Sequence, residues 1–522
     1  MNLWQITIGL CVFSGLLISC AAGASRSNTP TAAAAAQPAA KPAAPAPMPV
    51  AQAPQPATKP AVRPGSKNTD RAEVLMLGPN RFEGHVYDLI YSYLLESGIY
   101  LELDDHDRLP EELPWDLSQY KVIIVDKSLP VVEYAGFKEH LDRYAAQGGT
   151  VIYHTPPAET NWKANDPEMY EVYNKVVAAG VKLQNPAFLK RNAARPDRDV
   201  ILSSTARQTT VPGLVGWYRI GNDVAFMHFE GILKTAELYN RPDLRDFVLW
   251  MLDDIVRTHG DKPLPVFGGH LVDQFQKLGR QDYYERCMKS LRPASMLVDR
   301  VEFTRRTNPA VACETVSGLG DFMALAKHAP DPNEYYQPLV DMMKLCHDAL
   351  FEPTTQLWAH GGTRGGEPTP AWSRGYGWML IGLVGIIENL PKDHPDYPLM
   401  VQYLEETTNG LSRYQDATGL WHCIVDDPNT RLEASGTAMI LRSYCHAWRA
   451  GVCRTPQVKA MLTKAWYGLK THTVGGRTFS FLWGQGATHD KSAYAVNPSS
   501  GTPYLAPLAG PEYVITFGPL VP

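Results

Sequence analysis

The sequence predicts a multi-domain protein in which an α/β region precedes an all-α, (α/α) toroid, behind an N-terminal export signal and linker. Up to about residue 260, short apolar runs alternate with helical patterns, which is typical of a parallel sheet covered by helices. From Pro263 onward the apolar period is helical almost throughout, and short turns with Pro or Gly separate the helices. The 522 residues also exceed what one hydrophobic core usually holds.

Composition and charge exclude several classes of function. Hydrophobic residues make up 44% and charged residues 20% of the chain, as in ordinary globular proteins. A net charge of −5 gives no reason to expect a nucleic-acid partner. An acidic substrate would therefore have to be met by a local cation rather than by a global field. The cysteines form no CxxC pair, so the sequence supports neither a metal site nor a redox cofactor.

Residues 1–20 are predicted to be a lipoprotein signal peptide. The apolar run 6–18 is too short to span a bilayer comfortably, and it ends in Leu-Ile-Ser-Cys-Ala, which resembles a bacterial lipobox. We expect Cys20 to carry the lipid and to anchor the chain in the bacterial cell envelope, at the outer membrane, facing the periplasm or the cell surface. An uncleaved signal with an accidental cysteine is the alternative, because residues 1–5 lack Lys and Arg. Residues 21–69 are predicted to be an extended linker rich in Ala and Pro.

Residues 70–260 are predicted to form the α/β domain. Strands are expected at 74–77, 121–126, 150–154 and 224–229, and helices at 83–97, 137–147 and about 242–258. The pattern resembles the flavodoxin-like sheet of glutamine-amidotransferase-like and ThuA-like domains. No cysteine lies between Cys20 and Cys287, so the nucleophile of that family is absent and we expect no acyl-transfer chemistry. His154, His228 and Glu230 are expected at strand ends, where open sheets bind ligands, although a structural role is favoured for each.

Residues 261–522 are predicted to form the toroid. Helices are expected at 269–278, 282–291, 313–328, 334–350, 372–390, 397–414, 434–450 and 457–470. Repeated antiparallel helical hairpins of this size favour an α/α toroid over a four-helix bundle. The tail after Val474 has no helical period and is expected to run over one face of the toroid.

Several short segments of the helical half indicate a carbohydrate site. In WSRGYGW, residues 372–378, two glycines each cost about 1 kcal/mol inside a helix, which makes sense where a ligand or another backbone comes close. Arg374 and Trp378 are four residues apart on one helix face and suit an acidic sugar, whose carboxylate pairs with the guanidinium while the indole covers the ring. The candidate substrate-binding residues are His360, Trp372, Arg374, Trp378, Trp421, His422 and Glu433. Core packing is the alternative for the tryptophans, and a salt bridge is the alternative for the arginine.

The order of these segments carries a resemblance to a known family. LWAHG, WSRGYGW, DATGLWH and LEASGTAM resemble the unsaturated glucuronyl and rhamnogalacturonyl hydrolases of glycoside hydrolase families 105 and 88, over roughly residues 265–450. The resemblance implies an (α/α) toroid, no metal, and hydration of the double bond in an unsaturated uronic acid. A carboxylic acid protonates the enol ether, water adds, and the hemiketal falls apart, unlike ordinary two-carboxylate hydrolysis.

The expected function is the removal of a terminal unsaturated glucuronyl or galacturonyl residue from acidic oligosaccharides generated by polysaccharide lyases. Two alternatives stay open. One is a β-glucuronidase acting on saturated glucuronic acid, and the other is a non-catalytic carbohydrate-binding lipoprotein.

The resemblance assigns the general acid to Glu314. Ungapped counting back from LWAHG puts the family's catalytic Asp at this position, where the chain has a Glu instead. The family's second Asp is expected near residues 263–266, where none occurs. Asp321 lies seven residues on, so the two carboxylates share a helix face about 10 Å apart and Asp321 is the candidate partner. A solvated acidic stripe is the alternative, and Glu433 is a further candidate. We expect apolar neighbours to raise the pKa of Glu314 toward the working pH.

Overall fold

The computed structural model of the chain describes residues 73–78, 94, 99, 101–105, 117–127, 135–154, 167–181, 190, 192–210, 223–259, 266–430, 432–474, 477–478 and 505–522. The chain divides into two compact units, Met1–Asn68 and Thr69–Pro522, and all described residues belong to the second. The predicted lipidation site Cys20 and the predicted linker lie outside the described residues. Within the described ranges, no helix is both long and apolar enough to cross a membrane.

A parallel four-stranded sheet forms the first part of the described chain. Its strands are β1 (Val74–Gly78), β2 (Leu101–Asp105), β3 (Val122–Asp126) and β4 (Thr150–His154). They are ordered β2-β1-β3-β4, and every neighbouring pair is parallel. The short helix η2 (Leu117–Gln119) precedes β3, while α3 (Ala135–Ala146) and α4 (Pro167–Ala178) pack against β4. The strands expected at 74–77, 121–126 and 150–154 are therefore confirmed, and β2 is an addition.

The strand expected at 224–229 is wrong, because this segment lies in helix α8 (Asp223–Leu238). Residues 225–230 are buried without interruption, so the segment shows neither an alternating pattern nor an exposed helix face. A short apolar run of this kind does not distinguish a buried strand from a fully buried helix. His228 and Glu230 are consequently mid-helix residues, whereas His154 does end strand β4.

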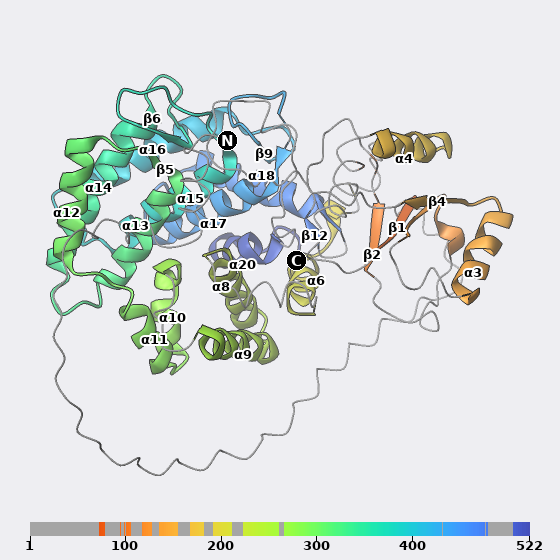
Figure 1. Cartoon of the computed structure of the whole chain (residues 1–522), viewed down its shortest axis with the longest axis horizontal. Coiled ribbons are helices and arrows are strands. Elements are labelled where there is room, and N and C mark those ends of the chain that lie inside the picture. The colour runs from red at the N-terminus through yellow and green to blue at the C-terminus, as the bar shows by residue number, and fades with distance from the viewer. Residues whose placement is uncertain are drawn as a thin grey trace, which may run out of the picture. The chain divides into compact units, whose positions relative to one another are not determined.

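The helical half is a toroid whose inner ring closes among the described residues. The inner elements are α8, η4 (Val266–Leu271), α13 (Cys313–Ala326), α15 (Ser373–Asn389), α17 (Ala434–Ala450) and α20 (Ala506–Phe517). Around the ring α13 packs on α15, α15 on α17, α17 on α20, and α20 on α8; η4 joins α8 to α13 (Figure 1). The other helices are α6 (Asp197–Thr210), α9 (Pro242–His259), α10 (Val272–Lys277), α11 (Gln281–Met288), α12 (Ala294–Thr307), α14 (Asn333–Leu350), α16 (Tyr397–Arg413) and α18 (Pro456–Thr471).

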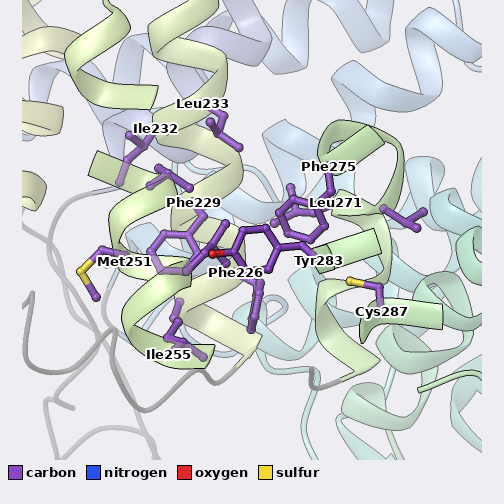
Figure 2. Packing of buried hydrophobic residues seen from close by; sticks show 14 of the residues in the cluster. Phe226, Phe229, Ile232, Leu233, Met251, Ile255, Leu271, Phe275, Tyr283 and Cys287 are labelled. Atoms are coloured by element: carbon purple, nitrogen blue, oxygen red, sulfur yellow. The ribbon is translucent and has the colours of Figure 1, made fainter. Parts of the chain in front are cut away.

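The toroid includes helices that the sequence analysis had given to the α/β domain. One buried cluster joins Phe226 and Phe229 of α8 and Met251 of α9 to Leu271 of η4 and Tyr283 of α11 (Figure 2). Helix α6 packs on α20 and α8 as well. The packing therefore begins the helical half before residue 260, at least as early as α6, and supplies the helices that the predicted toroid lacked.

The tail after Val474 is not wholly irregular, because it contains the inner helix α20. Local sequence hides this helix: its first turn begins Ala-Pro, and Pro511 lies inside it. Residues 506–513 are all buried, so tertiary packing between α17 and α8 overrides the poor helix propensity. The expectation of a tail running over one face is wrong for this segment.

A buried ion pair fastens the two ends of the toroid to one another. The Asp197 carboxylate at the start of α6 accepts from Lys470 Nζ at 2.6 Å and from Trp466 Nε1 at 2.9 Å, both on α18. The Leu520 amide donates to the same carboxylate. Asp197 and Lys470 are fully buried, so each charge depends on the other for compensation.

Candidate active site

The N-terminal turns of three inner helices meet at one end of the toroid. Glu314 lies in the first turn of α13, Arg374 in that of α15 and Ser435 in that of α17. Helix N-termini carry partial positive charge and unpaired N–H groups, so this end of the ring favours anions. The site therefore has the polarity that an acidic sugar requires, although the chain as a whole is acidic.

A short ladder places His360 against Glu314. Strand β5 (Val311–Ala312) pairs antiparallel with β8 (Gly361–Gly362), and the Cys313 amide donates to the His360 carbonyl at 2.9 Å. His360 Nε2 then lies 2.9 and 3.1 Å from the two carboxylate oxygens of Glu314. The imidazole is 1% exposed, whereas the Glu314 side chain is 32% exposed. A buried imidazole thus lies behind a carboxylate that solvent, and hence substrate, can reach.

The expected increase in the pKa of Glu314 is wrong in direction. Burial does raise the pKa of this carboxyl, but the imidazole of His360, a backbone amide and the guanidinium of Arg374 outweigh it. Its pKa therefore lies below the ordinary value. The apolar neighbours in sequence did not reveal these two groups, which come from residues 46 and 60 positions away. In the free protein Glu314 is held as a carboxylate.

Arg374 is held by a chain of hydrogen bonds. Its Nε donates to Ser435 Oγ at 2.9 Å, and the Ser435 hydroxyl donates in turn to the Glu433 carboxylate. The guanidinium lies 5.0 Å from the ring centre of Trp372, in cation–π geometry. This partner differs from Trp378, which shares a helix face with Arg374 and was the expected one. Helical side chains point back toward the N-terminus, which explains why the preceding tryptophan is the partner.

Glu433 contacts the site residues Arg374 and Ser435 from a buried position. Its side chain is fully buried, caps α17 by accepting from the Gly436 amide, and lies 3.9 Å from Arg374. Burial raises the pKa of Glu433, and Arg374 opposes that rise. Direct substrate binding by Glu433 stays a prediction, while its burial and its contacts support a role in positioning Arg374. Ser435, the link between them, was missed; its place beside a helix cap was the available signal.

The tryptophans divide between the site and the core. Trp372 is buried beside His360, with ring centres 4.6 Å apart. Trp378 is buried six residues further along, one turn beyond Arg374 on α15. Trp421 is fully buried, and its indole N–H donates to the Leu411 carbonyl at 2.9 Å, which supports the core-packing alternative.

His422 contacts its own loop. Its Nδ1 lies against the Thr430 carbonyl, and its Nε2 is 3.6 Å from Asp416. These contacts occupy both ring nitrogens without reaching Glu314 or Arg374. Substrate binding by His422 stays a prediction that no contact in the described part of the chain supports.

Both glycines of WSRGYGW lie against neighbouring side chains, and a Cβ at Gly377 would lie 2.5 Å from Cβ of Met439. A Cβ at Gly375 would lie 3.0 Å from Cδ2 of His360, so the glycine makes room for the imidazole. The close neighbour is thus a site residue rather than a second backbone.

Asp321 does not lie on a solvated stripe. It is buried, and its Oδ1 accepts from the His270 amide at 2.9 Å and lies 3.0 Å from His270 Nδ1. Asp321 therefore fastens α13 to η4, two turns below Glu314. A catalytic role for it stays a prediction, and its known contacts point away from the acid.

Comparison with known proteins bears out the resemblance. Residues 319–505 match the model of Glycosyl Hydrolase Family 88, a range that begins shortly after Glu314. The chain is 27% identical over 130 residues to the unsaturated rhamnogalacturonyl hydrolase YesR of Bacillus subtilis, covering 24% of this chain and 38% of that protein. It is 30% identical over 115 residues to the unsaturated 3S-rhamnoglycuronyl hydrolase of an Alteromonas species, covering 22% of this chain and 28% of that protein. The matches therefore span about a third of these relatives.

The fold has a solved counterpart. A possible member of the GH105 family from Salmonella enterica superposes with a TM-score of 0.51 at 20% identity, covering 62% of this chain and 94% of that one. This likeness concerns the fold, and it agrees with the toroid that the helix contacts define.

Proposed function

We propose that this chain is a glycoside hydrolase that removes a terminal unsaturated uronyl residue from oligosaccharides produced by polysaccharide lyases. The observation that carries the proposal is the Glu314–His360 pair beside Arg374, at the positive ends of three inner helices. The similarity to two unsaturated uronyl hydrolases supports the same substrate class.

Arg374 is the residue that would bind the substrate carboxylate. Its guanidinium is oriented by Ser435 and lies over Trp372. Because the side chain is already ordered, binding costs little further side-chain entropy. A charge-assisted pair with a carboxylate contributes about 1.5–3 kcal/mol. An Arg374→Lys variant keeps the positive charge but loses the paired N–H donors that bind a carboxylate bidentately. We therefore expect a higher KM with a smaller change in kcat.

Glu314 would transfer the proton to the enol ether carbon, after which water adds and the hemiketal opens. That step requires the carboxylic acid, whereas the free protein holds the carboxylate. A uronate bound at Arg374 would neutralise one of the cations that lower the pKa of Glu314 and would add a negative charge nearby. Both changes raise the pKa of Glu314.

The test uses lyase-digested polysaccharides and follows the ultraviolet absorbance of the conjugated double bond. We expect wild-type protein to remove that absorbance and Glu314→Gln to lose at least about a hundredfold in kcat, since general acid catalysis contributes 10²–10⁴. Hydrolysis of saturated glucuronides alone would replace the proposal with the β-glucuronidase alternative. Binding without turnover would favour the carbohydrate-binding lipoprotein.

The remaining parts of the chain are also matters of proposal. Lipidation at Cys20 would tether the enzyme to the bacterial cell envelope, with residues 21–69 as the spacer. The strand order β2-β1-β3-β4 supports a flavodoxin-like or amidotransferase-like sheet, since flavodoxin-like folds share this order. No acyl-transfer activity is expected from it, because it lacks a cysteine.

A further inference from the structure

A second polar cluster lies inside the ring, away from the candidate active site. Glu230 of α8, His446 of α17 and Glu512 of α20 each offer one ligand atom, and these atoms lie within 4.8 Å of one another. His446 is eleven residues beyond Ser435 on α17, which corresponds to about 16 Å along the helix axis. The cluster therefore lies toward the opposite end of the toroid.

Each member is fixed by a second partner on its far side. Arg442 Nη2 lies 2.6 Å from Glu230 Oε2, and Arg449 donates to Glu512 Oε2. Glu388 Oε1 lies 3.0 Å from His446 Nδ1. These contacts leave His446 Nε2 and the Oε1 atoms of both glutamates facing one another. Histidine and carboxylate ligands of metal ions are oriented by outer partners in the same way.

The facing atoms lie at ion-pair distance, although their angles fall outside hydrogen-bond geometry. His446 Nε2 lies 3.4 Å from Glu230 Oε1 and 3.2 Å from Glu512 Oε1. Among the described residues, neither His446 Nε2 nor Glu512 Oε1 has a hydrogen-bond partner, although both atoms are buried. Glu512 is 1% exposed, so water does not readily supply the missing partner.

We propose that Glu230, His446 and Glu512 bind a divalent cation, with zinc as the preferred ion. One imidazole and two carboxylates form a donor set that zinc takes at about 2.0–2.2 Å, and tetrahedral bonds of that length set neighbouring ligand atoms about 3.3–3.6 Å apart. The observed separations of 3.2 and 3.4 Å come close to this spacing. The His446 side chain is partly exposed, which leaves a route for the ion.

The charge of the surroundings supports a cation. Glu230, Glu512 and Glu388 carry three negative charges, and Arg442 and Arg449 carry two positive ones. The cluster is therefore negative when His446 and His270, whose Nε2 lies 3.8 Å from Glu230 Oε2, are both neutral. A proton on His446 is the competing occupant. Burial lowers the pKa of His446, but the carboxylates of Glu388 and Glu512 outweigh it and raise the pKa well above its ordinary value. Zinc must displace that proton.

The position of the site gives the ion a function. Helix α8 is the first inner helix of the ring and α20 is the last, and they meet with α17 at this cluster. Three ligands from three helices would fasten the ring where its two chain ends close. The ion is accordingly structural, and it takes no part in the proposed hydrolysis.

The experiment titrates the chelator-treated, full-length protein with zinc chloride by calorimetry and records Tm with and without zinc. We expect one equivalent to bind and Tm to rise, since an ion that binds only the folded state stabilises it. Glu512→Gln should abolish this binding, and Glu388→Gln, which alters only the outer partner, should weaken it about 10–100-fold. Asp273→Asn, which changes a surface carboxylate paired with Lys327, is the matched control and should bind zinc like wild type.

X-ray absorption at the zinc edge keeps the proposal testable even if a variant fails to fold. The wild-type spectrum should show only nitrogen and oxygen ligands near 2.0–2.2 Å. Sulfur ligands at about 2.3 Å would place the metal at cysteines and overturn the proposal. Zinc binding of equal strength by wild type and Glu512→Gln would overturn it as well, as would no binding at all, leaving the proton on His446 as the occupant.

Discussion

Replacing His360 tests the central electrostatic argument for the candidate site. His360→Gln keeps a hydrogen-bond donor of similar reach but removes a group that can carry positive charge. Its Nε2 lies 2.9 and 3.1 Å from the Glu314 oxygens, and the imidazole is the foremost of the contacts that lower the pKa of Glu314. Burial, which raises this pKa, remains in the variant, so the pKa of Glu314 must move upward.

The size of the change follows from the distance. An opposite charge within about 4–6 Å shifts a carboxyl pKa by about one to three units. The proposed reaction needs protonated Glu314, so kcat/KM of the wild type falls as pH rises through the pKa of the free enzyme. In His360→Gln that fall should move to higher pH. Because kcat reports the enzyme–substrate complex, its limb should move less.

The measurement is the pH profile of kcat/KM for a lyase-generated unsaturated disaccharide. His328→Gln serves as the control, because His328 makes a comparable 2.7 Å contact with the carboxylate of Asp273 on the outside of the toroid. Its profile should overlay that of the wild type. A His360→Gln enzyme that is slower but keeps the wild-type profile would refute the reasoning and leave His360 with a steric role only.

Three further predictions concern packing, closure and anchoring. Gly382→Ala should destabilise the fold by about 1–3 kcal/mol or more, since its Cβ would lie 1.8 Å from the Val316 carbonyl oxygen; Gly318→Ala, with open space, should be neutral or stabilising in the same urea titration. Asp197→Asn should cost about 3–5 kcal/mol, because it leaves the Lys470 charge buried without its partner; a loss below 1 kcal/mol would show that the ion pair does not close the toroid. Cys20→Ser should move the protein from the membrane fraction to the soluble fraction, and retention with unchanged mobility would contradict the anchor.

Local sequence determined most of the long amphipathic helices. Helices α14 and α16 match their predicted ranges to within a residue because each presents a regular apolar face whose start is marked by Pro. The motif order was enough to select the family and to indicate Glu314, His360 and Arg374 as candidate site residues.

Tertiary structure decided the elements whose local signal was weak or ambiguous. Helices α8 and α20 are buried on nearly every side, so periodicity cannot identify them, and α20 also carries internal proline. Only ring closure reveals that both are inner helices. The boundary of the toroid followed from the same packing.

The direction of the pKa shift of Glu314 could not be predicted from local sequence either. The sequence around Glu314 is apolar, and from it alone the pKa should rise. The sign is reversed by His360 and Arg374, which reach the carboxylate through a two-residue ladder and the start of another helix. The sequence by itself determined which chemical groups the protein carries, whereas their charge states were decided by contacts between distant segments, because electrostatic energy depends on distance in space rather than along the chain.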